Sequence, residues 1–190
     1  LGALTASGSG TTPNIAIGYS AGAGMTTGGN NIAIGSWCMD DVVTGSTNIG
    51  IGAGALGVLT SGANNVVIGS WAGDAITTGL MNTAVGNGAG GAITSAENNT
   101  CIGFNTGDAL TTGNGNVHIG GGAGGAQTTG TSSICIGVNA GSNLVDNTAG
   151  NAMIIGYGAQ ASAADVGGHE LVLGPGTAKG VNTAFVVAGG

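Results

Sequence analysis

A repeat of seventeen residues governs most of this chain. Each copy has an asparagine followed four residues later by a glycine, as in the segment NVVIGSWAGDAITTG that begins at Asn65. The asparagine recurs at Asn14, Asn31, Asn48, Asn65, Asn82, Asn99 and Asn116, and Ser133 takes the next position. The glycine is present in all eight copies, at Gly18, Gly35, Gly52, Gly69, Gly86, Gly103, Gly120 and Gly137. So strict a period predicts a solenoid, in which each repeat buries its apolar side chains against its neighbours.

Aliphatic side chains occupy fixed positions in the repeat, which we number from the asparagine as position 1. Position 4 is Ile17, Ile34, Ile51, Ile68, Val85, Ile102, Ile119 and Ile136, and position 2 is Ile, Val or Thr in every copy. This alternation predicts a short β-strand, and we expect positions 2 and 4 to form the core. A second apolar column at position 12 is Met25, Val42, Leu59, Ile76, Ile93, Leu110, Gln127 and Leu144. It predicts a return strand, so the fold class is an all-β parallel β-solenoid (β-roll) with two short strands per coil.

Other positions in the repeat have the residues expected at corners. The glycine at position 5 follows the strand, where a left-handed backbone or a close approach would exclude a Cβ atom. We expect the asparagines at position 1 to stack and to hydrogen-bond to one another and to nearby backbone. Thr77, Thr78 and Gly79 illustrate a Thr-Thr-Gly sequence at positions 13 to 15 that marks the second corner.

The regularity of the repeat divides the chain into three parts. Residues 1–13 lack the full pattern and are predicted to be an entry segment or a degenerate first coil. Residues 14–149 are the regular array of eight repeats. Residues 150–190 are predicted to be irregular coils and a C-terminal cap, because an uncapped solenoid exposes unpaired strand edges.

Composition excludes several classes of protein. The 190 residues include 44 glycines but only six aromatic residues, two each of Trp, Tyr and Phe, too few to fill a broad globular core. The net charge is −7, and Lys179 is the one basic residue. Binding to nucleic acid or to an anionic membrane surface is therefore excluded, because nothing neutralises phosphates. No apolar run is long enough to insert into a membrane.

Position 3 lies between the two aliphatic positions and so on the opposite face of the strand. It is occupied by Ala16, Ala33, Gly50, Val67, Ala84, Cys101, His118 and Cys135, with none of the Thr, Ser, Lys or Glu typical of a solvent-facing strand. We therefore expect this face to be covered by further copies of the chain around a shared axis. No metal site is predicted, and the one axial candidate is His118, three copies of which could bind a metal ion if the axis were threefold.

The pattern N-x-A-I-G-x-x-A-G-x-x-x-T-T-G, best seen at residues 14–28 and 65–79, resembles repeats of phage tail fibres and bacterial surface adhesins. More distantly it is similar to the head repeats of trimeric autotransporter adhesins, which usually have shorter coils. The resemblance covers residues 14–149 and implies a homotrimer of parallel β-rolls. Such a rod would be on a virion surface or outside the cell, and it would contact a host or neighbouring cell surface.

Catalytic chemistry is not indicated by the sequence. His118 and His169 are the two histidines, and no motif places an activated nucleophile beside either. We predict no enzymatic activity and no cofactor. The three cysteines are expected to be free buried thiols. Asp40, Asp74 and Asp108 recur every thirty-four residues and are predicted to be solvated turn residues, since carboxylates two coils apart cannot share a calcium ion.

Two further features bear on function. Five of the six aromatic residues follow the strand glycine by one or two positions and should line one edge, namely Tyr19, Trp37, Trp71, Phe104 and Tyr157. These rings could contact a host glycan or protein, or they could shield the turn and fill gaps between protomers.

The alternative function is an ice-binding solenoid that uses the threonine ladder. Adjacent threonines point to opposite sides of the chain, which speaks against that alternative.

Overall fold

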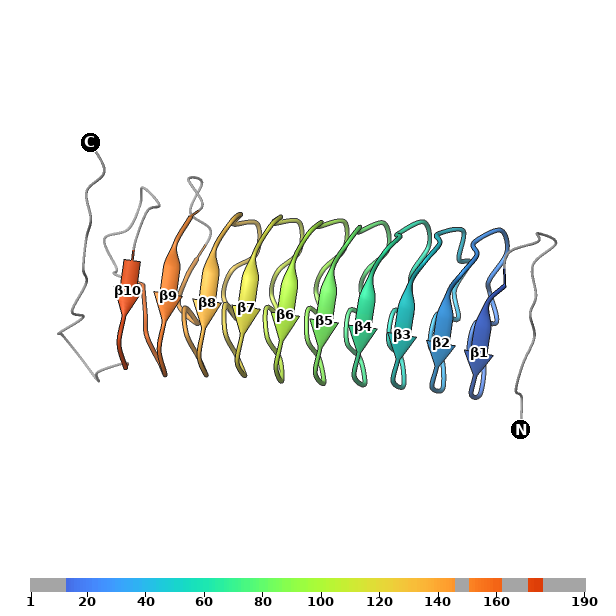
Figure 1. The fold of residues 1–190 in the computed structure, drawn as a ribbon, viewed down its shortest axis with the longest axis horizontal. Coiled ribbons are helices and arrows are strands. Elements are labelled where there is room, and N and C mark those ends of the chain that lie inside the picture. Colours follow the sequence, from blue (N-terminus) through green and yellow to red (C-terminus); the bar gives the residue numbers. More distant parts are fainter. Residues whose placement is uncertain (1–12, 146–150, 162–170, 176–190) are drawn as a thin grey trace.

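A computed structural model describes residues 13–145, 151–161 and 171–175. Ten strands of three residues form one parallel sheet in chain order, from β1 to β10 (Figure 1). Their bounds are β1 Ile15–Ile17, β2 Ile32–Ile34, β3 Ile49–Ile51, β4 Val66–Ile68, β5 Thr83–Val85, β6 Thr100–Ile102, β7 Val117–Ile119, β8 Ile134–Ile136, β9 Met153–Ile155 and β10 Leu171–Leu173. The predicted all-β parallel β-solenoid with a seventeen-residue period is confirmed.

The sheet keeps its register along the whole rod. Ile15 pairs with Ile32, and the same position pairs with itself in each following coil. Strands β9 and β10 continue this sheet beyond residue 149, after longer coils. The predicted entry segment lies outside the described residues except for Pro13, and so does most of the predicted C-terminal cap.

The return path of each coil differs from the prediction of a second strand. It is a series of turns, and the one β-bridge there among the described residues joins Met25 to Val43. Backbone hydrogen bonds still join the coils along this side, for example from Thr77 N to Thr94 O at 3.0 Å. The path takes a left-handed backbone on both sides of position 12, as at Gly73 with φ of 50° and Met81 with φ of 57°, so only a short segment remains between the turns.

The two faces of the strand are the reverse of those predicted. The position 3 side chains point into the coil and are buried, whereas positions 2 and 4 point outward, with Ile17 46% exposed. The narrow interior explains this difference. A Cβ atom on Gly50 would lie 2.8 Å from Cys38 Sγ and 2.9 Å from Met39 Cε, so in this coil no larger side chain fits between the strand and the return path.

The second apolar column and the asparagine column both lie in this interior. Position 12 is buried as predicted, except that the second coil buries Val43 and exposes Val42. The predicted asparagine ladder is confirmed by repeated hydrogen bonds. The Asn48 backbone N–H donates to Asn31 Oδ1 at 2.8 Å, and Asn48 Nδ2 donates to the carbonyl of Gly62 at 2.9 Å. The ladder satisfies buried polar groups that would otherwise destabilise so thin a core.

The glycine at position 5 has the predicted left-handed backbone. In all ten strands the glycine that follows has φ between 120° and 143°. A Cβ atom on Gly18 would lie 2.6 Å from the carbonyl oxygen of Gly35 in the next coil. Any other residue would therefore disrupt both the backbone conformation and the stacking of coils.

Candidate docking surfaces

The outward side chains of the sheet form a continuous surface, which we call the aliphatic face. It comprises positions 2 and 4 of all ten strands, twenty side chains in total, and only Thr83 and Thr100 among them are not apolar. None of the twenty is charged. With parallel strands about 4.8 Å apart, the nine intervals give this face a length of about 43 Å.

The aliphatic face is unusual for the surface of a single chain. All of its side chains are partly or largely exposed to solvent, for example Ile17 and Ile68. Contiguous apolar patches of more than a few hundred Å² are rare on soluble monomers and usually mark interaction sites. The aliphatic face therefore has the properties of a protein interface.

The residues predicted to face a trimer axis are not on this surface. Ala16, Ala33, Val67, Ala84, Cys101, His118 and Cys135 lie inside the coil of one chain, and that expectation is wrong. Three His118 side chains cannot meet there around an axis between protomers. Among the described residues, no group of His, Cys, Asp or Glu is arranged to hold a metal ion.

The three cysteines have the role expected of them. Cys38, Cys101 and Cys135 are free and buried. Desolvation raises the pKa of each thiol to about 12. They remain protonated at neutral pH and act as small apolar side chains in the core.

His118 is the one histidine in the described residues, and it lies in the core with an unusual neighbour. Neither ring nitrogen has a hydrogen-bond partner, and Gln127 Oε1 also lacks one. Gln127 replaces the apolar residue of position 12 in the same coil, and its Nε2 donates to Ser133 Oγ at 2.9 Å. Desolvation lowers the pKa of His118 to about 4, and nearby Gln127 offsets this only in part. The imidazole is therefore neutral at physiological pH.

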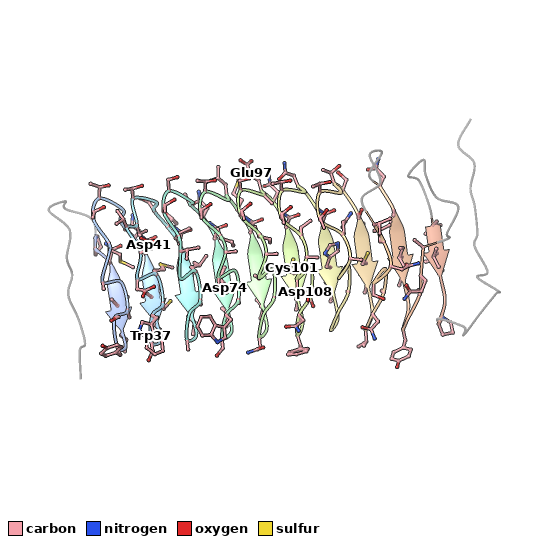
Figure 2. All side chains as sticks on the ribbon, turned by 180° about the vertical axis from the view of Figure 1, so that it is seen from behind. Trp37, Asp41, Asp74, Glu97, Cys101 and Asp108 are labelled. Atoms are coloured by element: carbon pink, nitrogen blue, oxygen red, sulfur yellow. The ribbon has the colours of Figure 1, made fainter. Side chains whose placement is uncertain are left out.

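The aromatic residues lie on a second surface, which we call the aromatic edge. Tyr19, Trp37, Trp71, Phe104 and Tyr157 are all exposed, and all come just after the ends of parallel strands, which lie at one edge of the sheet. Figure 2 shows Trp37 at this edge, beyond the tips of the strand arrows. The rings of Tyr19 and Trp37 meet edge to face, with centroids 5.8 Å apart. The predicted placement along one exposed edge is confirmed, whereas the role of the rings is not tested by it.

Position 7, within this edge, has a feature that the sequence did not reveal to us. Its backbone is left-handed in every described coil, and φ lies between 47° and 67°. From the second coil onward, larger residues alternate with glycine, in the order Trp37, Gly54, Trp71, Gly88, Asn105, Gly122, Asn139 and Gly158. A Cβ atom on Gly54 would lie 2.6 Å from Trp71 Cε3, and Asn105 and Asn139 likewise cover Gly88 and Gly122 of the preceding coils, whereas Trp37 follows the coil of Ser20. The structural period on this edge is thirty-four residues.

Part of the threonine ladder is bonded within the rod. In each coil from the first to the sixth, one threonine hydroxyl bonds to a carbonyl of the next coil, as Thr60 Oγ1 does to Thr77 O at 3.0 Å. The second threonine of a pair, such as Thr78, is exposed instead. Asp74 and Asp108 lie on the return path, nearer the middle of the coils than Trp37 (Figure 2). Partial burial raises the pKa of Asp74.

Comparison of the chain with family models, with curated proteins and with solved structures gives no match. No helix long and apolar enough to cross a membrane is found in the described part of the chain. The fold places the chain in the class of parallel β-solenoids. Its function is argued below from the aliphatic face and the aromatic edge.

Proposed function

We propose that this protein is a non-enzymatic structural and adhesive rod. It would be a segment of a phage tail fibre or bacterial surface adhesin, located on a virion or outside the cell. One observation supports this most. The rod has an uncharged aliphatic face along one side and a separate row of exposed rings along one edge. A shaft that assembles through one surface and touches a host or neighbouring cell with another needs this division.

The assembly that we propose is a homotrimer joined through the aliphatic face rather than through position 3. The twenty side chains of this face are comparable to the about 20–30 residues that each partner contributes to a standard interface. Two aliphatic columns on a narrow strip suit cyclic closure, because position 2 of one protomer can pack against position 4 of the next. This contact buries the apolar face and leaves the aromatic edge in solvent.

The mass of the purified protein in light scattering tests this assembly. Wild type should be a trimer, and Ile68→Lys should give monomers because it places charge in the interface. The matched control is Val58→Lys. Val58 is 41% exposed, close to the 37% of Ile68, but lies on the return path, so this variant should remain a trimer. A monomeric wild type, or a trimer indifferent to Ile68→Lys, contradicts the proposal.

Adhesion itself is tested by the binding of the labelled trimer to a panel of bacterial cells. Saturable binding that unlabelled trimer displaces supports an adhesive rod. Absence of binding to every strain in the panel, with trimers intact, contradicts that part of the proposal and leaves a purely structural shaft.

A further inference from the structure

Two tryptophans occupy backbone positions that do not suit them. Position 7 is left-handed in every described coil, and glycine and asparagine are the residues that accept this conformation most readily. Glycine or asparagine is found at that position in Gly54, Gly88, Asn105, Gly122, Asn139 and Gly158. Trp37 and Trp71 have the same left-handed backbone, with φ of 56° and 57°. For so bulky a side chain this conformation is strained.

Burial within the chain does not compensate for this strain. The Trp37 side chain remains 48% exposed and that of Trp71 54% exposed. Their contacts are with surface groups, since Trp71 lies over Gly54 and Trp37 meets the edge of the exposed Tyr19 ring. The fold does not need tryptophan at this position, because other coils close with glycine or asparagine. A strained, exposed aromatic residue of this kind indicates a binding role.

The arrangement of the two indoles limits what they can bind. They are two coils apart, about 9.6 Å by strand spacing. The coil between them has only the small residues Ala53 and Gly54 at positions 6 and 7, and the Trp71 ring lies over Gly54, so no bulky side chain separates the two indoles. Ser36 and Ser70, each partly exposed, immediately precede the tryptophans and supply hydroxyl groups. A ligand that fits is an extended chain of flat units with apolar faces and polar edges.

The charge of the chain restricts the class of ligand further. The net charge is −7, and the described residues include no lysine or arginine. A polyanion would be repelled and would find no cation along this edge. We infer that Trp37 and Trp71 bind a neutral oligosaccharide by stacking against the apolar faces of its sugar rings, an inference that rests on the adhesive function proposed above.

The chain itself supplies a matched variant to test this site. Trp37→Asn/Trp71→Asn installs the residue found at the equivalent positions Asn105 and Asn139. Binding is measured by calorimetry and affinity electrophoresis with neutral β-linked glucose and N-acetylglucosamine oligomers, and with a sulfated polysaccharide for comparison. Wild type should bind a neutral oligomer and not the sulfated one. The double variant should lose affinity at least tenfold, with its trimer mass unchanged and its melting temperature equal or higher, because strain is removed.

A control variant separates this site from exposed rings in general. Phe104→Ser removes another exposed ring of the aromatic edge, from a coil whose position 7 is Asn105, and should bind as wild type does. Wild type without affinity for any neutral saccharide overturns the inference. So does a double variant that binds with unchanged affinity. A double variant that loses its trimer also overturns it, because the tryptophans would then be packing elements.

The adhesion assay distinguishes failure of this inference from failure of the adhesive function. Trimer that adheres to cells, but neither binds saccharide nor depends on the two tryptophans, overturns the saccharide site alone. Adhesion lost after protease treatment of the cells, and retained after periodate oxidation of their sugars, identifies a protein partner and also overturns the inference. Wild type that fails to adhere to any cell overturns the adhesive function itself.

Discussion

Single residues in this solenoid are selected by the space and backbone available to them. Inside the coil, Ala84, Cys101 and His118 occupy equivalent positions although they differ in size and polarity, and His118 fits because Gly107 and Gly124 lie against its ring. At position 7 the backbone is left-handed, and a tryptophan there costs about 1–2 kcal/mol relative to glycine. The space inside the coil therefore accommodates a histidine. The left-handed backbone at position 7 makes tryptophan an unusual residue there.

The buried histidine should make the rod sensitive to acid. The pKa of His118 is lowered to about 4 in the folded chain from 6.5, so the unfolded chain binds more protons between these values. Stability is therefore unaffected above about pH 6.5 and falls as the pH is lowered toward 4. At about 1.4 kcal/mol per pKa unit, the total loss is about 3 kcal/mol.

The variant His118→Leu should remove this part of the acid dependence. Urea unfolding at a series of pH values from 7 to 4 measures the free energy of unfolding of both proteins. The free energy of unfolding that wild type loses and the variant keeps should be lost only below about pH 6.5. Equal pH dependence in the variant would mean that His118 is not buried in its neutral form.

At the scale of elements, each strand separates two different environments. In β5, Thr83 and Val85 point outward and Ala84 points into the coil. Alternation along the sequence identifies these two sets but not which of them is inside. The width of the coil decides that, and it is set by the return path.

Two lysine substitutions in β5 should therefore have opposite effects. Ala84→Lys places an uncompensated charge in the narrow interior and should destabilise the folded chain by about 3–5 kcal/mol. Thr83→Lys points its charge into the aliphatic face, so the chain should stay folded and fail to assemble. Circular dichroism during heating reports folding, and light scattering reports assembly. A folded, assembled Ala84→Lys variant would contradict the assignment of the two faces.

Sequence reasoning recovers the parts of this fold that depend on local rules. The period, the register, the ladder from Asn14 to Ser133 and the glycine at position 5 all follow from residue types at fixed spacing. The return path does not, because nothing about Trp37 or Trp71 indicates a left-handed backbone. The prediction of a second strand is wrong for that reason. The aromatic edge could be predicted, since positions just after parallel strands always share one edge.

At the scale of the whole molecule, the rod is a one-dimensional stack in which each coil contacts its neighbours. From the third coil onward its unit on the aromatic edge is nevertheless two coils, because Trp71, Asn105 and Asn139 each cover a glycine at position 7 of the preceding coil. Asp40, Asp74 and Asp108 follow the same interval of thirty-four residues, and Gly57, Gly91 and Gly125 occupy the equivalent position in the coil that follows each of them.

This double-coil unit predicts which deletions the rod tolerates. Removing residues 48–81, two coils, places the coil of Gly88 next to that of Trp37 and preserves the alternation. Removing residues 48–64, one coil, places Trp71 against the coil of Trp37, which lacks the glycine, Gly54, that Trp71 covers in the intact rod. The shorter deletion should therefore lower the free energy of unfolding by about 1–3 kcal/mol more than the longer one.

Thermal unfolding compares the two deletions, and small-angle scattering measures their lengths. The rod lacking 48–81 should be shorter by about 9.6 Å and otherwise unaltered. Equal stability of the two variants would show that one coil is the unit after all.

The hydrogen bonds between coils, including those of the asparagine ladder, run along the length of the rod. A pull on its two ends therefore loads the junctions between coils in series, and the terminal coil is the first to detach. Each coil that unwinds releases seventeen residues, about 58 Å of extended chain, in place of about 4.8 Å of rod. Under load such a rod lengthens one coil at a time. Most of the length of the extended chain becomes available only as successive coils unwind.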